Sequence, residues 1–305
     1  MRRTIVILSV LLLAQLVLLV LVYRPPELMQ ADAAHAPLVR FMGSYVEEIN
    51  IDDDRDREVT LTLEGGSWRL PELDNMPADP EKVEALIAAI TSQDHGWPVA
   101  DTVAARQRFQ VAAYHFRRRI TLIGESELLG TVYLGTSPGF REVHARNDAE
   151  DAIYSIAFNV FDAPTTPSDW LDRRLLQNGN PLAISSATFA VELTDGRWLS
   201  AGGSAPDDRE LQALLLALAS LQVEGIADED DQRTLAEGEP ALSLTIRDAD
   251  GELMLELFEI GQGYAAYHSR YPAFFTVSAY DFDRLTGIDP TLLAGADETE
   301  QVSDD

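Results

Sequence analysis

Alternating apolar and polar residues first predict a strand at residues 58–63, Glu-Val-Thr-Leu-Thr-Leu. A Gly65-Gly66 turn and Trp68 follow, which indicates a hairpin. Further along, the apolar residues of 80–91 recur at i, i+3, i+4 and i+7, as on the buried side of an amphipathic helix. Asp79 precedes Pro80, and this pair is typical of a helix N-terminus.

The same pattern returns about 130 residues later. Residues 188–193 alternate again, Asp195-Gly196 forms a hairpin signal, and Trp198 follows it. Leucines at helical spacing then mark residues 211–218, after a Ser204-Ala-Pro-Asp207 segment with the spacing of a capping box. We interpret the two stretches as copies of one unit.

Both copies continue into a predicted antiparallel meander. After the first helix, strands are expected at 108–112, 119–123, 128–134, 141–146 and 152–158; after the second, at 242–246, 253–260, 264–270 and 274–279. The copies also match in short segments: Leu134-Gly135 with Ile260-Gly261, Val143–Arg146 with Tyr267–Arg270, Tyr154–Ile156 with Phe275–Val277, and Phe161 with Phe282. Internal duplication explains the shared order.

These patterns predict an α+β fold with two tandem pseudo-repeats, each an antiparallel β-meander sheet with one packed amphipathic helix. We place the first repeat at residues 45–177 and the second at 178–289. Residues 228–231 are expected to form an acidic loop, and the acidic tail 290–305 to be disordered.

An apolar run at residues 5–22 follows Arg2-Arg3 and has the length of a transmembrane helix. The arginines favour a cytoplasmic N-terminus, so we expect a single-pass anchor (1–24) in the bacterial inner membrane, a linker (25–44) and a periplasmic remainder. The lipid bilayer is thus one expected partner. The alternative is a cleaved signal, for which Ala31-Asp-Ala33 and Ala34-His-Ala36 offer cleavage sites. We favour the retained anchor.

Charge and cysteine content exclude several classes of function. The formal net charge is −28, with 51 acidic and 23 basic residues, and of the basic ones only Lys82 is a lysine. Such a surface repels phosphate backbones, so no nucleic-acid partner is expected. Because there are no cysteines, disulfides, thiolate metal sites and cysteine nucleophiles are excluded.

Four short motifs suggest chemistry but are better explained as turns. Asp52–Arg57 is interpreted as a solvated hairpin tip rather than a cation site. Gly135-Thr-Ser137-Pro-Gly139 has the letters of a nucleophile elbow, but a strand follows it and Pro138 has no N–H for an oxyanion hole. Asp248–Gly251 lacks the later ligands of a calcium loop, and Gly261-Gln-Gly263 lacks a third glycine.

Two histidine–arginine pairs are the strongest candidates for a binding site. His144 with Arg146, and His268 with Arg270, each share a strand face at spacing i, i+2, and could form two pseudo-symmetric points for an anion or a partner. Alternatively, the pairs lie on the solvent face and offset nearby acidic residues. We expect no catalytic residue, no metal site and no cofactor. The tryptophans are expected in the core: Trp68, Trp97, Trp170 and Trp198.

Several segments resemble a known family: Trp68–Pro71, Pro77–Val83, Leu134–Phe140, Val143–Arg146 and Asp162–Asp172. Together with the anchor they resemble a bacterial family of membrane-anchored domains of unknown function, described as the auxiliary component of gliding-motility-type ABC transport systems. The resemblance implies a non-enzymatic binding or accessory protein whose partner is an ABC transporter or another envelope protein. The alternative is an extracytoplasmic ligand-binding module or hydrolase with a cleft between the repeats.

Overall fold

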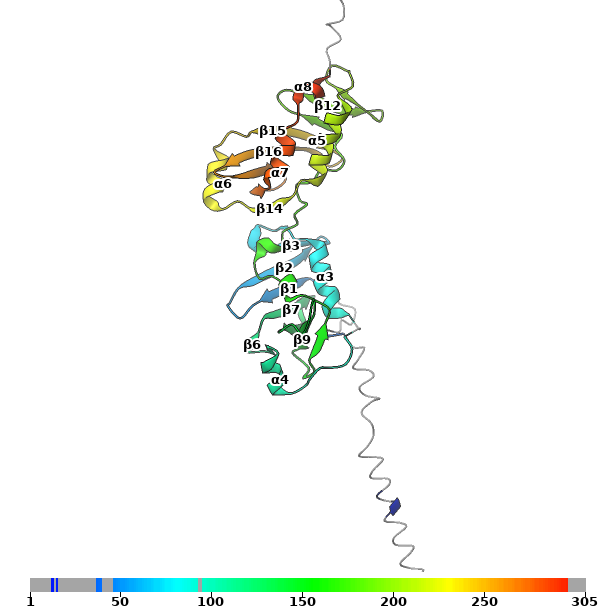
Figure 1. The fold of residues 1–305 in the computed structure, drawn as a ribbon, viewed down its shortest axis with the longest axis vertical. Helices are drawn as coiled ribbons and strands as arrows, with labels where there is room; N and C mark the ends of the chain where they lie inside the picture. Colours follow the sequence, from blue (N-terminus) through cyan, green and yellow to red (C-terminus); the bar gives the residue numbers. More distant parts are fainter. Residues whose placement is uncertain (1–11, 14, 16–36, 40–45, 93–94, 296–305) are drawn as a thin grey trace, which may run out of the picture. The chain divides into compact units, whose positions relative to one another are not determined.

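The computed structural model describes residues 12, 13, 15, 37–39, 46–92 and 95–295. These residues form a mixed α/β structure with two large antiparallel sheets and few helices (Figure 1). By compactness the chain divides into a first unit, Met1–Glu58 with Glu84–Ala163, and a second unit, Val59–Val83 with Pro164–Asp305. No helix within the described ranges is long and apolar enough to cross a membrane, and the run 5–22 lies almost wholly outside them.

The first sheet has eight strands in the order β10-β9-β8-β7-β1-β2-β3-β4. Their bounds are β1 Glu48–Asp52, β2 Glu58–Glu64, β3 Ser67–Leu70, β4 Met76–Pro77, β7 Arg118–Gly124, β8 Glu127–Leu134, β9 Val143–Asn147 and β10 Tyr154–Ile156. Ile49 and Ile51 of β1, and Ile120 and Leu122 of β7, are fully buried. Since side chains alternate along a strand, these residues form one apolar face.

Helix α3 (Pro80–Thr91) begins as predicted, because Asp79 Oδ1 accepts a hydrogen bond from Glu81 N at 3.0 Å. Its apolar stripe, Val83, Leu86 and Ile90, is fully buried. Lys82 lies on the exposed side of this helix, and its Nζ donates to the Asp169 carbonyl oxygen at 2.6 Å.

The stretch expected as a strand at 108–112 is a strand only at its end, Val111–Ala112. Helix α4 (Val103–Arg108) occupies its start, because Thr102 caps that helix by accepting a hydrogen bond from Ala105 N. A two-stranded sheet of β5 (Val111–Ala112) and β6 (His115–Phe116) follows. Tyr133 of β8 and Ile153, which precedes β10, pack with this segment in a separate apolar cluster.

The second sheet also has eight strands, in the order β13-β12-β11-β15-β16-β17-β18-β14. Their bounds are β11 Ala183–Ser185, β12 Ala190–Thr194, β13 Arg197–Ser200, β14 Val223–Ile226, β15 Leu242–Asp248, β16 Gly251–Ile260, β17 Gly263–His268 and β18 Phe274–Val277. The predicted hairpin turns at Asp195-Gly196, at 248–251 and at 261–263 are confirmed.

Four helices belong to the second sheet's part of the chain: α5 (Asp208–Ser220), α6 (Glu229–Ala236), α7 (Ala279–Thr286) and α8 (Pro290–Ala294). Helix α5 buries Leu211, Leu214 and Leu218, which were predicted as its stripe. Helix α6 packs through Leu235 on Phe258 and Ala265, in a cluster of its own.

The second copy differs from expectation at three helix ends. Residues 228–231 are not a loop: Asp228 Oδ1 accepts hydrogen bonds from the N–H groups of Asp230 and Asp231 and so starts α6. The cap of α5 is Asp207 rather than Ser204, whose hydroxyl bonds to Ser200. The tail begins with helix α8, and residues 296–305 lie outside the described residues.

The two sheets repeat one strand order. Seven strands of each sheet have counterparts at the same place in the chain order. The first sheet runs β10-β9-β8-β7-β1-β2-β3, and the second runs β18-β17-β16-β15-β11-β12-β13. Ile153 also pairs with Ala100 by an isolated bridge, as β18 pairs with β14. The strand orders fit a tandem duplication.

Candidate functional site

His144 is buried in β9 and is engaged on both sides. Its Nδ1 lies 2.7 Å from the carbonyl oxygen of Thr136, and a carbonyl can only accept, so Nδ1 carries the proton. The imidazole ring stacks on Phe109, with 4.1 Å between ring centroids. The alternative placement on the solvent face is wrong for this residue, because it is 7% exposed.

Arg146 is also buried, and its guanidinium acts as a clamp on backbone carbonyls. Its Nε donates to the carbonyl oxygen of Val111 at 2.8 Å, and Nη1 donates to those of Asn147 and Glu150. The guanidinium carbon lies 4.9 Å from the centre of the Tyr133 ring. These contacts join β9 to β5 and to the loop after β9, which is a structural role.

The second pair, His268 and Arg270, does not share a strand face. β17 ends at His268, so Arg270 lies in the following turn, where its Nη2 is 2.9 Å from both carboxylate oxygens of Asp248. Asn178 donates to the same carboxylate at 2.9 Å. Burial raises the pKa of Asp248, but the hydrogen bonds from Arg270, Asp250 N and Asn178 outweigh burial, and the net pKa is lowered.

His268 is 3% exposed. Burial is the largest influence on it and, together with the charge of Arg270, lowers the pKa of its imidazole to about 4, although Asp248 acts in the opposite direction. The side chain is therefore neutral at pH 7. A neutral, buried imidazole offers no positive charge to an anion.

The two pairs are not equivalent by sheet register. If Tyr154 corresponds to Phe275, the ladders match their partners, Ala145 and Ala266. His144 then corresponds to Ala265 rather than to His268. The two His-x-Arg segments therefore occupy different positions in their sheets and are not related by the repeat. The binding role of these residues stays a prediction.

The Asp52–Arg57 segment is not a simple solvated tip, because Asp52 and Asp53 are buried. Arg119 Nε donates to Asp52 Oδ2 at 2.9 Å, across the ladder from β7 to β1. Burial is the largest single influence on Asp53 and raises its pKa. The hydrogen bonds from Arg57 and from two backbone N–H groups lower the pKa and together outweigh burial. The net pKa of Asp53 is lowered.

Beside this turn lies an open pocket of about 380 Å³ within the first unit, which we name the arginine pocket. Besides Asp53, Asp54, Gln110, Val160 and Phe161, it is lined by four arginines: Arg55, Arg57, Arg117 and Arg118. In the sequence, the consecutive arginines Arg117, Arg118 and Arg119 could have indicated this pocket. That signal was missed because only the pairing of β7 with β1 brings the run to the charged turn.

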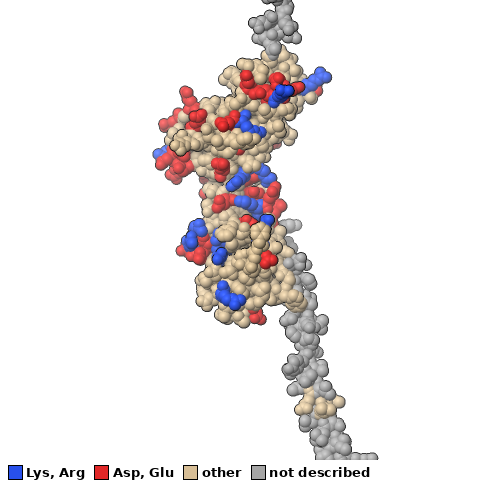
Figure 2. All heavy atoms as spheres, viewed as in Figure 1, with Lys and Arg blue, Asp and Glu red and all other residues tan. Residues whose placement is uncertain are grey.

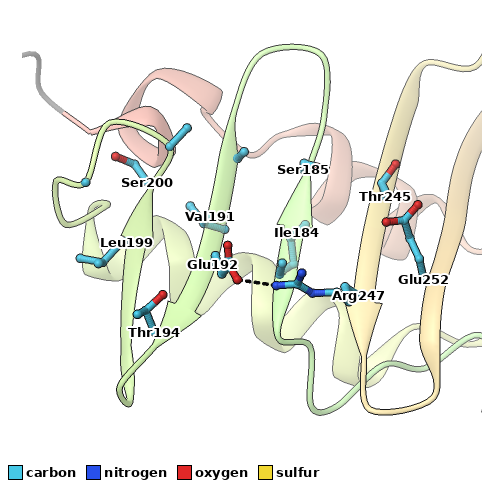
Figure 3. Close-up of a pocket in the computed structure, with 14 residues that line it drawn as sticks. Ile184, Ser185, Val191, Glu192, Thr194, Leu199, Ser200, Thr245, Arg247 and Glu252 are labelled. Carbon is cyan, nitrogen blue, oxygen red and sulfur yellow. Dashed lines mark hydrogen bonds and ion pairs between the residues drawn. The ribbon is translucent and has the colours of Figure 1, made fainter.

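A second open hollow, of about 420 Å³, lies over β11, β12, β13 and β15 of the second sheet (Figure 3). Glu192 and Arg247 lie on its open side, whereas Ile184 and Val191, also drawn in Figure 3, are buried. Small residues create the hollow, since Ala183, Ser185 and Ala190 lie between longer side chains. Arg247 reaches over Ala183 to Glu192, with 2.5 Å between Nη2 and Oε1.

The remaining sequence candidates are placed as follows. The hydroxyl of Ser137 donates to the carbonyl oxygens of Gly139 and Glu142, and β9 follows, which confirms a turn. Trp68 and Trp170 are buried as predicted, whereas Trp97 is 55% exposed and Trp198 is half-buried. Within the described residues, no three His, Asp or Glu side chains are placed to hold a metal ion.

Comparison with known protein families identifies the family of this chain. A family model described as DUF4340, a domain of unknown function, matches residues 68–240. No curated protein and no solved structure matches the chain. The match runs from β3 to the residue before Ala241, so it covers parts of both sheets rather than one copy. Because the match spans more than half of the chain, the protein belongs to the DUF4340 family.

Proposed function

We propose that this protein is a non-enzymatic accessory protein of the bacterial envelope. Residues 5–22 hold it in the inner membrane, the two tandem repeats lie in the periplasm, and they bind a component of an ABC transport system. The family supplies the expectation of a domain without assigned activity. In support of the non-enzymatic part of the proposal, the histidine and arginine candidates make internal contacts rather than pointing into a shared cavity.

The observation that carries the proposal is the open face of the second sheet, which we define by the residues that line its hollow on β11, β12, β13 and β15. A sheet needs a covering layer on at least one face, and here α5 buries its leucine stripe on the other side. The open face mixes apolar Leu199, polar Thr194 and Thr245, and the Glu192–Arg247 ion pair. This mixture is compatible with a reversible interface, because such interfaces are about as polar as the rest of a protein surface.

A site-specific photo-crosslinking experiment tests this proposal in intact cells. A photoreactive residue at Thr194 or Thr245 should form adducts with a transport-system subunit, because both positions lie on the open face. The matched control is Asp283, an exposed residue of α7. Equal adducts from all three positions, or none with any envelope protein, would contradict the proposal.

A second variant tests the hollow itself. Ala183→Trp fills the space beneath the Arg247–Glu192 pair. We expect co-purification of the transport-system subunit to fall at least ten-fold while thermal unfolding stays unchanged. Protease added to spheroplasts tests the topology separately, since a periplasmic ectodomain should be digested without breaking the inner membrane.

A further inference from the structure

The arginine pocket is the exception in an acidic protein. Figure 2 shows acidic and basic atoms interspersed over the visible face, and the chain carries a net charge of −28. Four guanidinium groups nevertheless converge on one open pocket of about 380 Å³, against two carboxylates in its lining. The pocket therefore has an excess of two positive charges.

Two of the arginines are held rigidly. Arg57 bonds to Asp53 through Nε at 2.8 Å and Nη2 at 2.5 Å. Arg118 donates from Nε to the carbonyl oxygen of Ala163 at 2.6 Å and from Nη1 to that of Arg117 at 2.7 Å. Its Nη1 also lies 3.9 Å from Asp53 Oδ2. Fixed guanidinium groups lose little conformational entropy when a ligand arrives.

The other two arginines are exposed and can close on a ligand. Arg55 lies in the turn after β1, and Arg117 precedes β7, where Gln110 Oε1 accepts from its Nε at 2.9 Å. Phe161 adds an apolar surface to the pocket, with 73% of its area exposed. A ligand with an anionic group and an adjoining apolar part therefore fits this lining.

The fold does not require these arginines. At the same place in the second sheet, beside the β11–β12 connection and the start of β15, lies a pocket of about 450 Å³. Its described lining carries no charged side chain and consists of Ser185, Ser186, Ala187, Thr188, Pro240, Ala241, Leu242, Ser243 and Thr245. The same strand order thus supports both linings, so the arginines need a reason other than folding.

We propose that the arginine pocket binds a phosphoryl group, either of a free phosphate ester or of a lipid headgroup. A guanidinium fork matches two oxygens of a phosphate, and several forks can hold its tetrahedral oxygens at once. A phosphomonoester dianion balances the excess of two charges. A phosphodiester headgroup balances one of them, as a carboxylate does, and still offers two unesterified oxygens to a guanidinium fork. The remaining acidic surface opposes binding only weakly at physiological salt, where charges are screened beyond about 8 Å.

The test uses the full-length chain purified in a non-ionic detergent. Three probes are titrated in turn: inorganic phosphate, glycerol 3-phosphate and a short-chain phosphatidylglycerol, each followed by the width of its phosphorus-31 resonance. We expect saturable broadening at physiological salt. Binding of all three indicates a free phosphate ester as the source, and binding of phosphatidylglycerol alone indicates a lipid headgroup; both support the proposal.

The decisive variant is Arg55→Gln with Arg117→Gln, because both side chains are exposed and the fold should persist. We expect binding at least ten-fold weaker, and Arg117→Lys should give an intermediate loss because it keeps charge without the fork. The matched control is Arg209→Gln with Arg233→Gln, which removes the same charge from exposed positions in α5 and α6. No saturable binding of any probe, or equal loss in both double variants, would overturn the proposal. The inference is independent of the proposed transporter partner.

Discussion

The first and second sheets share a strand order but differ at one corner. Beside the connection between the first two strands, the first sheet has a pocket lined by four arginines, and the second has one lined mainly by serine, threonine, alanine and proline. The difference extends to the buried ion pairs, since Asp52 and Asp53 of the first copy bond to arginines. Duplicated architecture therefore constrains the apolar face of each sheet and leaves the loops free to acquire different chemistry.

Matched core substitutions test the shared part of this comparison and carry the largest expected effect. Ile120 in β7 and Leu244 in β15 lie on corresponding strands and are both buried. Ile120→Ala and Leu244→Ala should each lower the free energy of unfolding by about 3 to 4 kcal/mol, through lost burial and a residual cavity. Urea unfolding of the full-length chain measures both. A loss of less than about 1 kcal/mol in the free energy of unfolding for either variant would show that the two sheets do not depend equally on their apolar faces.

Two glycines that the sequence matched should separate the copies next. A Cβ on Gly135 would lie 1.9 Å from the carbonyl oxygen of Phe109, so Gly135→Ala should cost about 3 kcal/mol by overpacking. Gly261 has open space around it but a φ of +57°, so Gly261→Ala should cost about 1 kcal/mol. Thermal unfolding compares the two variants, and equal costs would show that the close approach at Gly135 is relieved by movement of the backbone.

Acid sensitivity should come from the second copy through His268. The pKa of His268 is lowered to about 4 in the folded protein, against about 6.5 in the unfolded chain. As pH falls below 6.5, the unfolded chain therefore takes up the proton before the folded protein does, and folding is destabilised. The contribution of His268 to the free energy of unfolding is nearly complete above pH 6.5, and about 2 kcal/mol of it is lost by pH 5. His268→Asn places there the amide that Asn147 provides at the corresponding register of the first sheet.

Urea unfolding at pH 7 and pH 5 gives the pH dependence of the wild type and of His268→Asn. The variant should lose most of the difference between the two pH values. An unchanged difference would mean that another group titrates in this range and that His268 is not the source.

The smallest effect is expected at the buried carboxylate of the arginine pocket. Asp53→Asn removes the charge that holds Arg57, and because Arg57 is half exposed we expect a cost of only about 1 kcal/mol at pH 7. The pKa of Asp53 is lowered, so its contribution is present above pH 4 and is lost as pH falls further. The exposed neighbour gives the control, since Asp54→Asn should change unfolding by less than about 0.5 kcal/mol.

Local signals in the sequence predicted the local structure well. Asp79 before Pro80 fixed the start of α3, and Asp195-Gly196 fixed the β12–β13 hairpin, because each depends on residues that are neighbours in the chain. Helix α6 was missed because its acidic first turn reads as a loop. Asp228 satisfies its N-terminal N–H groups, and Leu235 is its buried anchor.

The candidate site depended on long-range pairing and was predicted poorly. His144 and His268 were matched by neighbouring letters, although the strand registers align His144 with Ala265. Asp52 was assigned to a solvated turn because its partner, Arg119, lies 67 residues away and joins it only when β7 pairs with β1. A charged residue's burial depends on such partners, and composition does not reveal them.

The single lysine limits the crosslinking chemistry that can test for the proposed partner. Lys82 is the only side-chain amine in 305 residues, and its Nζ already donates to the Asp169 carbonyl oxygen. Amine-directed crosslinkers therefore have little to react with, and affinity surveys that depend on them will under-report complexes of this protein. Carbodiimide coupling, which activates carboxylates, has 51 acidic side chains to use and is the better reagent for testing the proposed partner.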